Sequence, residues 1–189
     1  MDLKEYAKKV EGLCIDYDGI YGHQCVDLIK HYAQNVLGVK LGSFGGSAKN
    51  GWDNTYNTFP ASQFEKITDK SRFQVGDIIF WDRGEHGHVA IITKTFGNGA
   101  FEVIEQNVGN GDGKGADDCV KLSVYPNYND VLGVYRFKGK MSQEMEEKLS
   151  KAQELGIFNG KDLDKPASRA EVALMCLRIF ELMFEKIEK

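Results

Sequence analysis

The sequence predicts an α+β protein followed by a small all-α domain. Helical periodicity comes first, in residues 2–11 and 24–37, and strand-like runs follow between residues 75 and 137. Helices that precede a series of consecutive strands are typical of the α+β class. The composition changes at Lys138-Gly139-Lys140, after which only helical patterns occur. We therefore expect one domain over residues 1–139 and a second over residues 140–189.

The N-terminal part is expected to hold two helices and a long loop. In residues 24–37 the apolar side chains recur at the spacing of one helix face, and Gly38 provides a stop. Residues 42–60 are rich in Gly, Asn, Ser and Thr, which predicts a loop. Trp52 and Tyr56 of this loop, together with Trp81, are expected to surround a substrate groove.

Short apolar runs separated by turn sequences predict an antiparallel sheet of about five strands. The turns are rich in glycine and asparagine, as in Phe96-Gly97-Asn98-Gly99. The expected strands are residues 75–81, 88–95, 101–107, 120–124 and 131–137.

The composition argues against nucleic acid and membranes as partners. The chain has 189 residues and a net charge of −4, so it carries no excess of basic residues for an anionic partner. No apolar run approaches the roughly 18 residues of a membrane span. The charged N-terminus lacks the apolar core of a secretory signal, which predicts synthesis in the cytoplasm.

The four cysteines are Cys14, Cys25, Cys119 and Cys176. None has the C-x-x-C spacing of a zinc ribbon. The pattern leaves a Cys14–Cys119 disulfide open, but cytoplasmic synthesis argues against it. Cys176 lies on the apolar stripe of an expected helix and is interpreted as a small buried hydrophobic residue.

Cys25 and His88 have the character of a nucleophile and its base. Cys25 follows Gly22-His23-Gln24 at the point where a loop becomes a helix. The positive end of the helix dipole favours a thiolate there, and the free backbone N–H groups could hold an oxyanion. His88 opens a predicted strand, and an imidazole near the thiol would act as the base.

Glu105 and Asn107 are the candidate partners of this histidine. They share one face of the next strand, and the short turn between the two strands predicts that they pair. The strand register could place either residue beside His88, where it would orient the ring as the third member of a triad. Three other histidines compete for the role of base. We expect His23 to point away from Cys25 and both His31 and His86 to lie on the surface.

Four sequence blocks resemble the CHAP family of cysteine, histidine-dependent amidohydrolases/peptidases. The blocks are Gly22-His23-Gln24-Cys25-Val26-Asp27-Leu28, Gly76-Asp77-Ile78-Ile79-Phe80, Gly87-His88-Val89-Ala90-Ile91 and Glu105-Gln106-Asn107. The resemblance covers roughly residues 5–137 and implies a papain-like fold. It implies that Cys25 is the nucleophile, that His88 is the base, and that Glu105 and Asn107 orient the histidine. The family cleaves amide bonds of bacterial peptidoglycan.

A calcium loop is expected at residues 16–27. Carboxylates at Asp16, Asp18 and Asp27 occupy positions 1, 3 and 12 of an EF-hand-like segment, and the carbonyls of Ile20 and Gly22 could complete it. Some CHAP lysins have a similar loop. Two departures from the EF-hand pattern favour the alternative, an ordinary turn rich in Asp and Gly: a tyrosine stands at position 6, and the shorter aspartate at position 12.

The C-terminal segment resembles a single S-layer-homology repeat. The resemblance rests on Leu155-Gly156-Ile157-Phe158-Asn159-Gly160 and on residues 166–173. It implies binding to a secondary polymer of the cell wall. The apolar surface of the last helix exceeds what one short helix can cover, which predicts homo-oligomers through this helix. Met141 could also serve as an internal start.

These expectations describe a bacteriophage endolysin that acts on the peptidoglycan of a Gram-positive wall. The enzyme would be made in the host cytoplasm and would reach the wall after holin-type release. The cleaved bond would be that of an N-acetylmuramoyl-L-alanine amidase, favoured here, or of a peptide-crosslink endopeptidase. The alternatives are a bacterial or prophage autolysin and a non-catalytic wall-binding protein on a CHAP fold.

Overall fold

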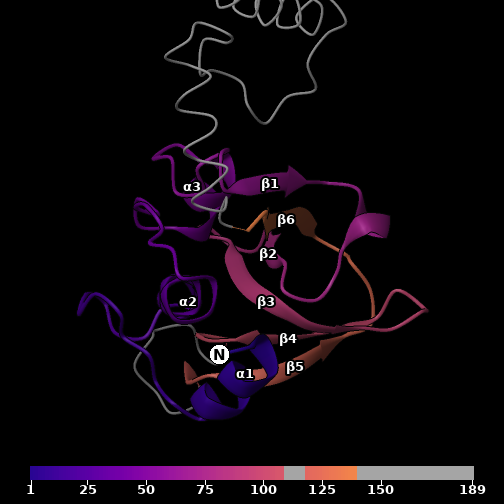
Figure 1. Cartoon of the computed structure of the whole chain (residues 1–189), viewed down its shortest axis with the longest axis horizontal. Coiled ribbons are helices and arrows are strands. Elements are labelled where there is room, and N and C mark those ends of the chain that lie inside the picture. Colours follow the sequence, from indigo (N-terminus) through magenta and orange to yellow (C-terminus); the bar gives the residue numbers. More distant parts are fainter. Residues whose placement is uncertain (109–117, 140–189) are drawn as a thin grey trace, which may run out of the picture. The chain divides into compact units, whose positions relative to one another are not determined.

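The computed structural model describes residues 1–108 and 118–139 (Figure 1). By its internal contacts the chain divides into Met1–Lys138 and Gly139–Lys189. The expected helical domain, with its wall-polymer, oligomer and internal-start assignments, lies outside the described residues.

Two helices begin the described domain. Helix α1 spans Leu3–Val10 and starts at a reciprocal cap, in which the backbone N–H of Glu5 donates to the Asp2 side chain at 2.8 Å. Helix α2 spans Cys25–Tyr32 and continues as one π-helical turn, Ala33–Leu37. It ends at Gly38, whose left-handed backbone (φ 66°) suits glycine.

The segment that the sequence predicted as a long loop contains a short helix, α3, at Ala48–Asp53. Its first turn is capped by Ser47, whose hydroxyl oxygen accepts from the backbone N–H of Asn50 at 3.1 Å. Asn54 ends the helix in a left-handed conformation. Local side-chain caps thus turn a Gly- and Asn-rich stretch into a helix, and the loop prediction was wrong for these residues.

The sheet has six antiparallel strands where the sequence predicted about five. Their order is β1-β6-β2-β3-β4-β5. The additional strand is β1, which pairs with β6 at the edge of the sheet. It has only four residues, too few to show an alternating pattern. The strands are β1 Phe64–Ile67, β2 Ile78–Trp81, β3 His88–Thr95, β4 Phe101–Glu105, β5 Lys121–Tyr125 and β6 Val131–Phe137.

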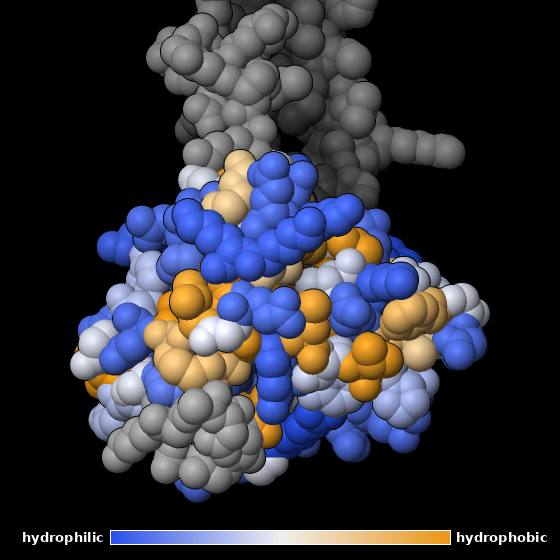
Figure 2. Space-filling view, turned by 90° about the horizontal axis from the view of Figure 1, so that it is seen from below, coloured by the Kyte–Doolittle hydropathy of each residue, from blue (hydrophilic) through white to orange (hydrophobic). Residues whose placement is uncertain are grey.

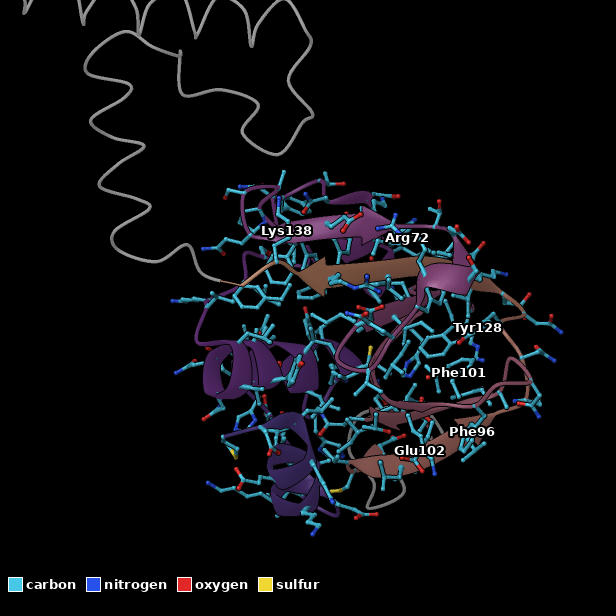
Figure 3. The ribbon with its side chains drawn as sticks, turned by 45° about the vertical axis from the view of Figure 1, so that its right-hand side comes forward. Arg72, Phe96, Phe101, Glu102, Tyr128 and Lys138 are labelled. Carbon is cyan, nitrogen blue, oxygen red and sulfur yellow. A yellow bond between two sulfur atoms is a disulfide. The ribbon has the colours of Figure 1, made fainter. Side chains whose placement is uncertain are left out.

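The sheet separates two hydrophobic clusters, because neighbouring residues of a strand point to opposite faces. Val89 and Ile91 of β3 belong to the cluster shared with α1 and α2, whereas Ala90 and Ile92 belong to the cluster on the other face. In the second cluster Phe101 stacks on Tyr128 with ring centroids 4.5 Å apart (Figure 3).

Gly133 in β6 allows a close approach of three segments. A Cβ atom at this position would lie 2.5 Å from the carbonyl oxygen of Ile67 and 2.5 Å from the Trp52 ring. Any larger residue would therefore push α3 or β1 away from the sheet.

Cys14 and Cys119 are joined in a disulfide, against the expectation from cytoplasmic synthesis. Backbone hydrogen bonds hold the two segments side by side. Gly12 donates to the Val120 carbonyl at 2.8 Å, and Val120 donates to the Leu13 carbonyl at 2.9 Å. The expectation was wrong because it considered the redox environment and not this proximity.

One face of the molecule shows hydrophobic residues in small groups among hydrophilic ones (Figure 2). Within residues 1–108 and 118–139, no helix has the length and hydrophobicity needed to cross a membrane.

Candidate active site

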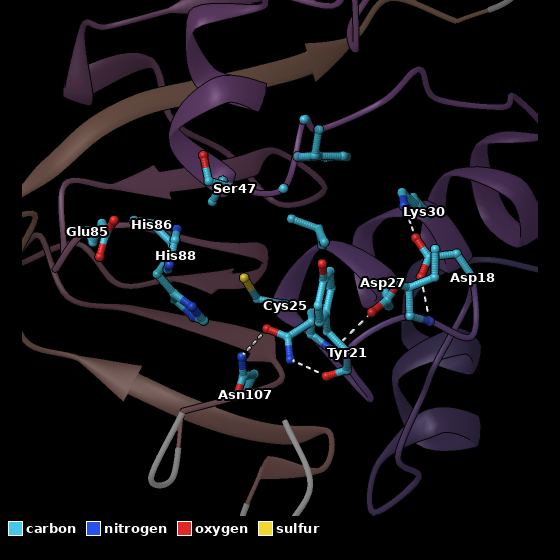
Figure 4. A pocket seen from close by; sticks show the side chains of 18 of the residues that line it. Asp18, Tyr21, Cys25, Asp27, Lys30, Ser47, Glu85, His86, His88 and Asn107 are labelled. Atoms are coloured by element: carbon cyan, nitrogen blue, oxygen red, sulfur yellow. Dashed lines mark hydrogen bonds and ion pairs between the residues drawn. The ribbon is translucent and has the colours of Figure 1, made fainter. Parts of the chain in front are cut away.

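A groove of about 770 Å³ contains both Cys25 and His88 (Figure 4). Its walls come from the loop before α2 and the start of that helix, from residues 43–48, from the turn 83–88 and from Asn107. Segments far apart in the sequence thus meet at one concave surface, as is usual for a binding site.

Cys25 is the first residue of α2 and is nine-tenths buried, and it is the free cysteine of the described residues. Gly22 precedes it with φ 73°, a conformation that favours glycine and turns the chain into the helix. Cys25 thus stands in the N-terminal turn of a helix, as the sequence predicted.

His88 lies between Cys25 and Glu105. Its Nε2 atom is 2.9 Å from Oε2 of Glu105, and Cys25 is the second side chain that acts on the charge of its ring. Because Nε2 lies beside the carboxylate, Nδ1 is the ring nitrogen that remains available to Cys25. The three residues lie at the first position of α2, the first position of β3 and the last position of β4.

The surroundings of His88 favour a protonated imidazole. Burial lowers the pKa of His88, but hydrogen bonds and charge interactions with Cys25 and Glu105 outweigh burial and raise it to about 9. Burial likewise raises the pKa of Glu105, yet hydrogen bonds led by His88 keep that pKa below its ordinary value. A protonated imidazole beside Cys25 is the arrangement that a thiolate nucleophile requires.

Tyr125 and Arg83 extend the hydrogen bonds of Glu105 away from His88. The Tyr125 hydroxyl lies 2.9 Å from Oε2 and 3.1 Å from Oε1 of Glu105. Arg83 donates to that hydroxyl at 3.2 Å, and its guanidinium lies 4.9 Å from the centroids of both the Tyr125 and Trp81 rings. Neither residue was predicted, since nothing near Tyr125 in the sequence marks it as a partner of a carboxylate 20 positions earlier.

Glu105, one of the two candidates for the partner of the histidine, makes the hydrogen bond to His88. The Asn107 side chain donates to the Gln24 side-chain oxygen at 2.8 Å. It thereby supports the residue just before the nucleophile.

Gln106 is fully buried and ties the loop before α2 to the sheet. Its amide nitrogen donates to the carbonyls of Ile15 and Gln24, each at 2.8 Å, and its oxygen accepts from the N–H of Ile15 at 2.8 Å. The block Glu105-Gln106-Asn107 therefore serves the site with all three side chains. The role of Gln106 was not predicted from the sequence.

The other histidines have separate environments. His23 is buried near Cys14 and Cys119. Nδ1 of His31 is 2.9 Å from the Tyr6 hydroxyl, so this side chain is part-buried and the expected surface position was wrong. His86 is exposed on the groove wall (Figure 4).

The groove is not formed by the predicted aromatic residues. Trp81 is 1% exposed in the second cluster, and Trp52 packs against Phe80 with ring centroids 5.7 Å apart. Both are used for packing, which the sequence pattern does not distinguish from binding. The groove instead presents Phe44 and the 81% exposed ring of Tyr21.

Asp16, Asp18 and Asp27 form an acidic cluster whose oxygen atoms lie within 4.8 Å of one another. Oδ1 of Asp27 is buried and has no hydrogen-bond partner among the described residues. Burial, with the nearby charges of Asp18 and Asp16, raises the pKa of Asp27 to about 6 although the Gln24 N–H opposes this. A cation would satisfy this oxygen and neutralise the cluster, so the residues fit a hard divalent metal ion.

The loop backbone supports this interpretation. Tyr21 has φ 63°, so it adopts at position 6 the turn for which EF-hands use glycine. Lys30 places its ammonium 2.6 Å from Oδ2 of Asp18 and is the cation that a metal ion would have to displace or share (Figure 4). The Gly22 carbonyl accepts from Gln24 at 3.1 Å. Roles for the Ile20 and Gly22 carbonyls as ligands remain predictions.

Comparisons with known proteins agree with this geometry. Residues 15–107 match the family model of the CHAP domain. The chain is 32% identical over 127 residues to Endolysin PlyTW of Staphylococcus phage Twort, a match that covers 58% of this chain and 24% of that protein. The crystal structure of the wild-type endolysin LysIME-EF1 is similar with a TM-score of 0.54 and 24% identity, over 75% of this chain and 64% of that one. The chain thus spans about a quarter of the first relative and less than two thirds of the second. Residues 15–107 therefore match the CHAP domain, and the described domain shares its α+β fold with that endolysin structure.

Proposed function

We propose that this protein hydrolyses an amide bond of bacterial peptidoglycan, as an endolysin does. The observation that carries the proposal is the set of Cys25, His88 and Glu105 in a groove at the start of a helix. The match to the CHAP domain and the similarity to two endolysins support the substrate class.

The reaction begins with attack of the Cys25 thiolate on the amide carbonyl carbon. N–H groups at the start of α2 stabilise the oxyanion that forms. The His88 imidazolium then gives its proton to the amine nitrogen as the C–N bond breaks, which leaves a thioester on Cys25. His88, now neutral, takes a proton from water, whose oxygen attacks the thioester. A carboxylic acid leaves and the thiolate–imidazolium pair is restored.

Glu105 holds His88 through both steps. Its carboxylate accepts from Nε2, which keeps Nδ1 directed at the sulfur atom and stabilises the imidazolium. We assign Tyr125 and Arg83 as positioning residues because they contact Glu105 and not the reacting atoms. Asn107 is assigned to the orientation of Gln24 beside the nucleophile.

A calcium ion held by Asp16, Asp18 and Asp27 is part of the proposal, with the carbonyls of Ile20 and Gly22 as further ligands. When bound, such an ion would neutralise the acidic cluster and brace the loop. Asp27 lies in the first turn of α2, two residues after Cys25, so the cluster and the nucleophile share one helical turn.

We retain residue 139 as the proposed domain boundary and the segment 140–189 as a module for wall binding or self-association. Synthesis in a host cytoplasm, holin-type release and a Gram-positive target belong to the same proposal. For the cleaved bond, an N-acetylmuramoyl-L-alanine amidase is favoured over a crosslink endopeptidase.

Digestion of purified peptidoglycan by the full chain tests this proposal. Mass spectrometry should find new amine and carboxyl ends at one bond type, and the identity of the ends assigns the bond. Cys25→Ser should lower the rate by roughly a thousandfold or more while wall binding is retained. His88→Ala should lose activity and His86→Ala should keep it, and the reverse result would transfer the role of base to His86. An active Cys25→Ser variant would refute the mechanism.

A further inference from the structure

Cys14, Cys119 and His23 form a second cluster of potential ligands, separate from the acidic one. One atom of each side chain, the two sulfur atoms and a ring nitrogen, lies within 4.8 Å of the others. Cys119 and His23 are buried and Cys14 is exposed. The proposed hydrolysis uses none of the three side chains.

The backbone, and not only the disulfide, brings these residues together. The hydrogen bonds between residues 12–13 and Val120 hold the two cysteine segments side by side. The Gln106 amide fixes Ile15 and Gln24, the neighbours of Cys14 and His23 in the sequence, to the same buried point. Reduction of the disulfide would therefore leave two thiols and an imidazole close to one another.

Such a set of donors suits zinc and not calcium. Thiolate sulfur and imidazole nitrogen are preferred zinc ligands, with Zn–S distances near 2.3 Å and Zn–N distances near 2.0 Å. Ligand atoms around a tetrahedral ion are thus separated by roughly 3–4 Å, which requires only a small movement of the two sulfur atoms apart. The oxygen atoms of the acidic cluster prefer hard cations, so the two sites would not compete for the same metal.

We propose that Cys14, Cys119 and His23 form a zinc site in the reduced protein and exchange it for the disulfide on oxidation. A dithiol reductant gives two electrons and two protons to the disulfide and becomes a disulfide itself. Zn²⁺ then binds the two thiolates and the His23 imidazole, the two thiol protons are released, and water completes the tetrahedron. Either state links the segment before α2 to residue 119.

The test uses the full chain with Cys25→Ser and Cys176→Ser, so that Cys14 and Cys119 are the only thiols. The protein is reduced, freed of metal and titrated with Zn²⁺ against a chromophoric chelator. Co²⁺ serves as a second probe, because thiolate ligands give it a charge-transfer absorption. We expect one Zn²⁺ per reduced chain, none in the oxidised protein, and a higher melting temperature of the reduced protein when Zn²⁺ is added.

Matched variants separate this site from chance binding. His23→Gln removes one ligand and should weaken Zn²⁺ at least about tenfold, whereas the exposed His86→Gln should bind as the parent does. Cys14→Ala, at an exposed position, should abolish binding and replaces His23→Gln if that variant does not fold. Absence of Zn²⁺ binding in the reduced parent, or equal binding by parent and His23→Gln, would overturn the proposal.

Discussion

Replacing Glu105 by glutamine tests whether its charge holds His88 in the protonated state. The glutamine side chain keeps the size of the glutamate and an oxygen that can accept from Nε2, but it removes the negative charge 2.9 Å from the ring. The structure places the pKa of His88 at about 9 with Cys25 and Glu105 as the two partners that raise it. Only the part of the increase in the pKa of His88 that the Glu105 charge causes should be lost.

The expected size of the change in the pKa of His88 follows from its short distance to the Glu105 carboxylate. An opposite charge at this distance shifts a pKa by about 1–3 units, and with the Cys25 interaction intact we expect the pKa of His88 to fall by roughly 1–2 units. At 1.36 kcal/mol per unit this is about 1.4–2.7 kcal/mol, or a ten- to hundredfold weaker preference for the imidazolium. At pH 8 the protonated fraction should decrease from roughly nine-tenths to between a tenth and a half.

Two measurements detect this decrease in the pKa of His88. The alkaline limb of the rate of wall hydrolysis, which falls as His88 deprotonates near pH 9, should move to lower pH in Glu105→Gln. Nuclear magnetic resonance titration of the ring protons of His88 gives its pKa directly in each protein.

Glu102→Gln is the matched control. Glu102 lies on the same strand, but its carboxylate accepts from the Thr93 hydroxyl at 2.8 Å, so His88 should titrate as in the parent. An unchanged pKa of His88 in a folded Glu105→Gln protein, or an equal shift in Glu102→Gln, would refute the reasoning.

Four further predictions concern other parts of the molecule. Calcium affinity, measured by calorimetry, should fall about tenfold for each pH unit below 6, because a proton competes for the raised pKa of Asp27; an affinity independent of pH would contradict this. Chelation with EDTA should lower the melting temperature, and an unchanged value would argue against a bound ion. Tyr125→Phe should raise the pKa of Glu105 and lower kcat about tenfold with KM unchanged, since it removes a hydrogen bond to a charged group; a change in KM alone would oppose the positioning role. Gly133→Ala should destabilise the fold by about 2 kcal/mol or more in denaturant titrations, whereas Gly97→Ala, which meets nothing within 4 Å, should not.

The proximity of Cys25 and His88, the proposed nucleophile and base, could be predicted from the sequence because their local settings carry the signal. A cysteine after a glycine-containing turn at a helix start and a histidine at a strand start each have a recognisable chemistry. The choice between Glu105 and Asn107 could not be made this way. Both were expected on one face of a strand, but β4 ends at Glu105 and Asn107 follows it with a left-handed backbone (φ 62°). The β3–β4 register also shifts between Ile92 and Lys94 through an irregularity that no local pattern specifies.

Features that depend on distant pairing were missed for the same reason. Tyr125 reaches Glu105 because β5 pairs with β4 across a long connection. Strand β1 is fixed by its partner β6 and not by its own four residues. The disulfide likewise depends on residues 105 positions apart meeting in space.

Helix α2 carries the sulfur atom, whereas the sheet carries the imidazole and the carboxylate. Neither layer alone contains all three side chains, so the proposed hydrolysis requires that helix and sheet stay docked. The rate of that reaction would consequently report on tertiary packing in this protein. In increasing denaturant, activity should vanish when the two layers separate, even while the strands remain paired and the helix keeps its turns.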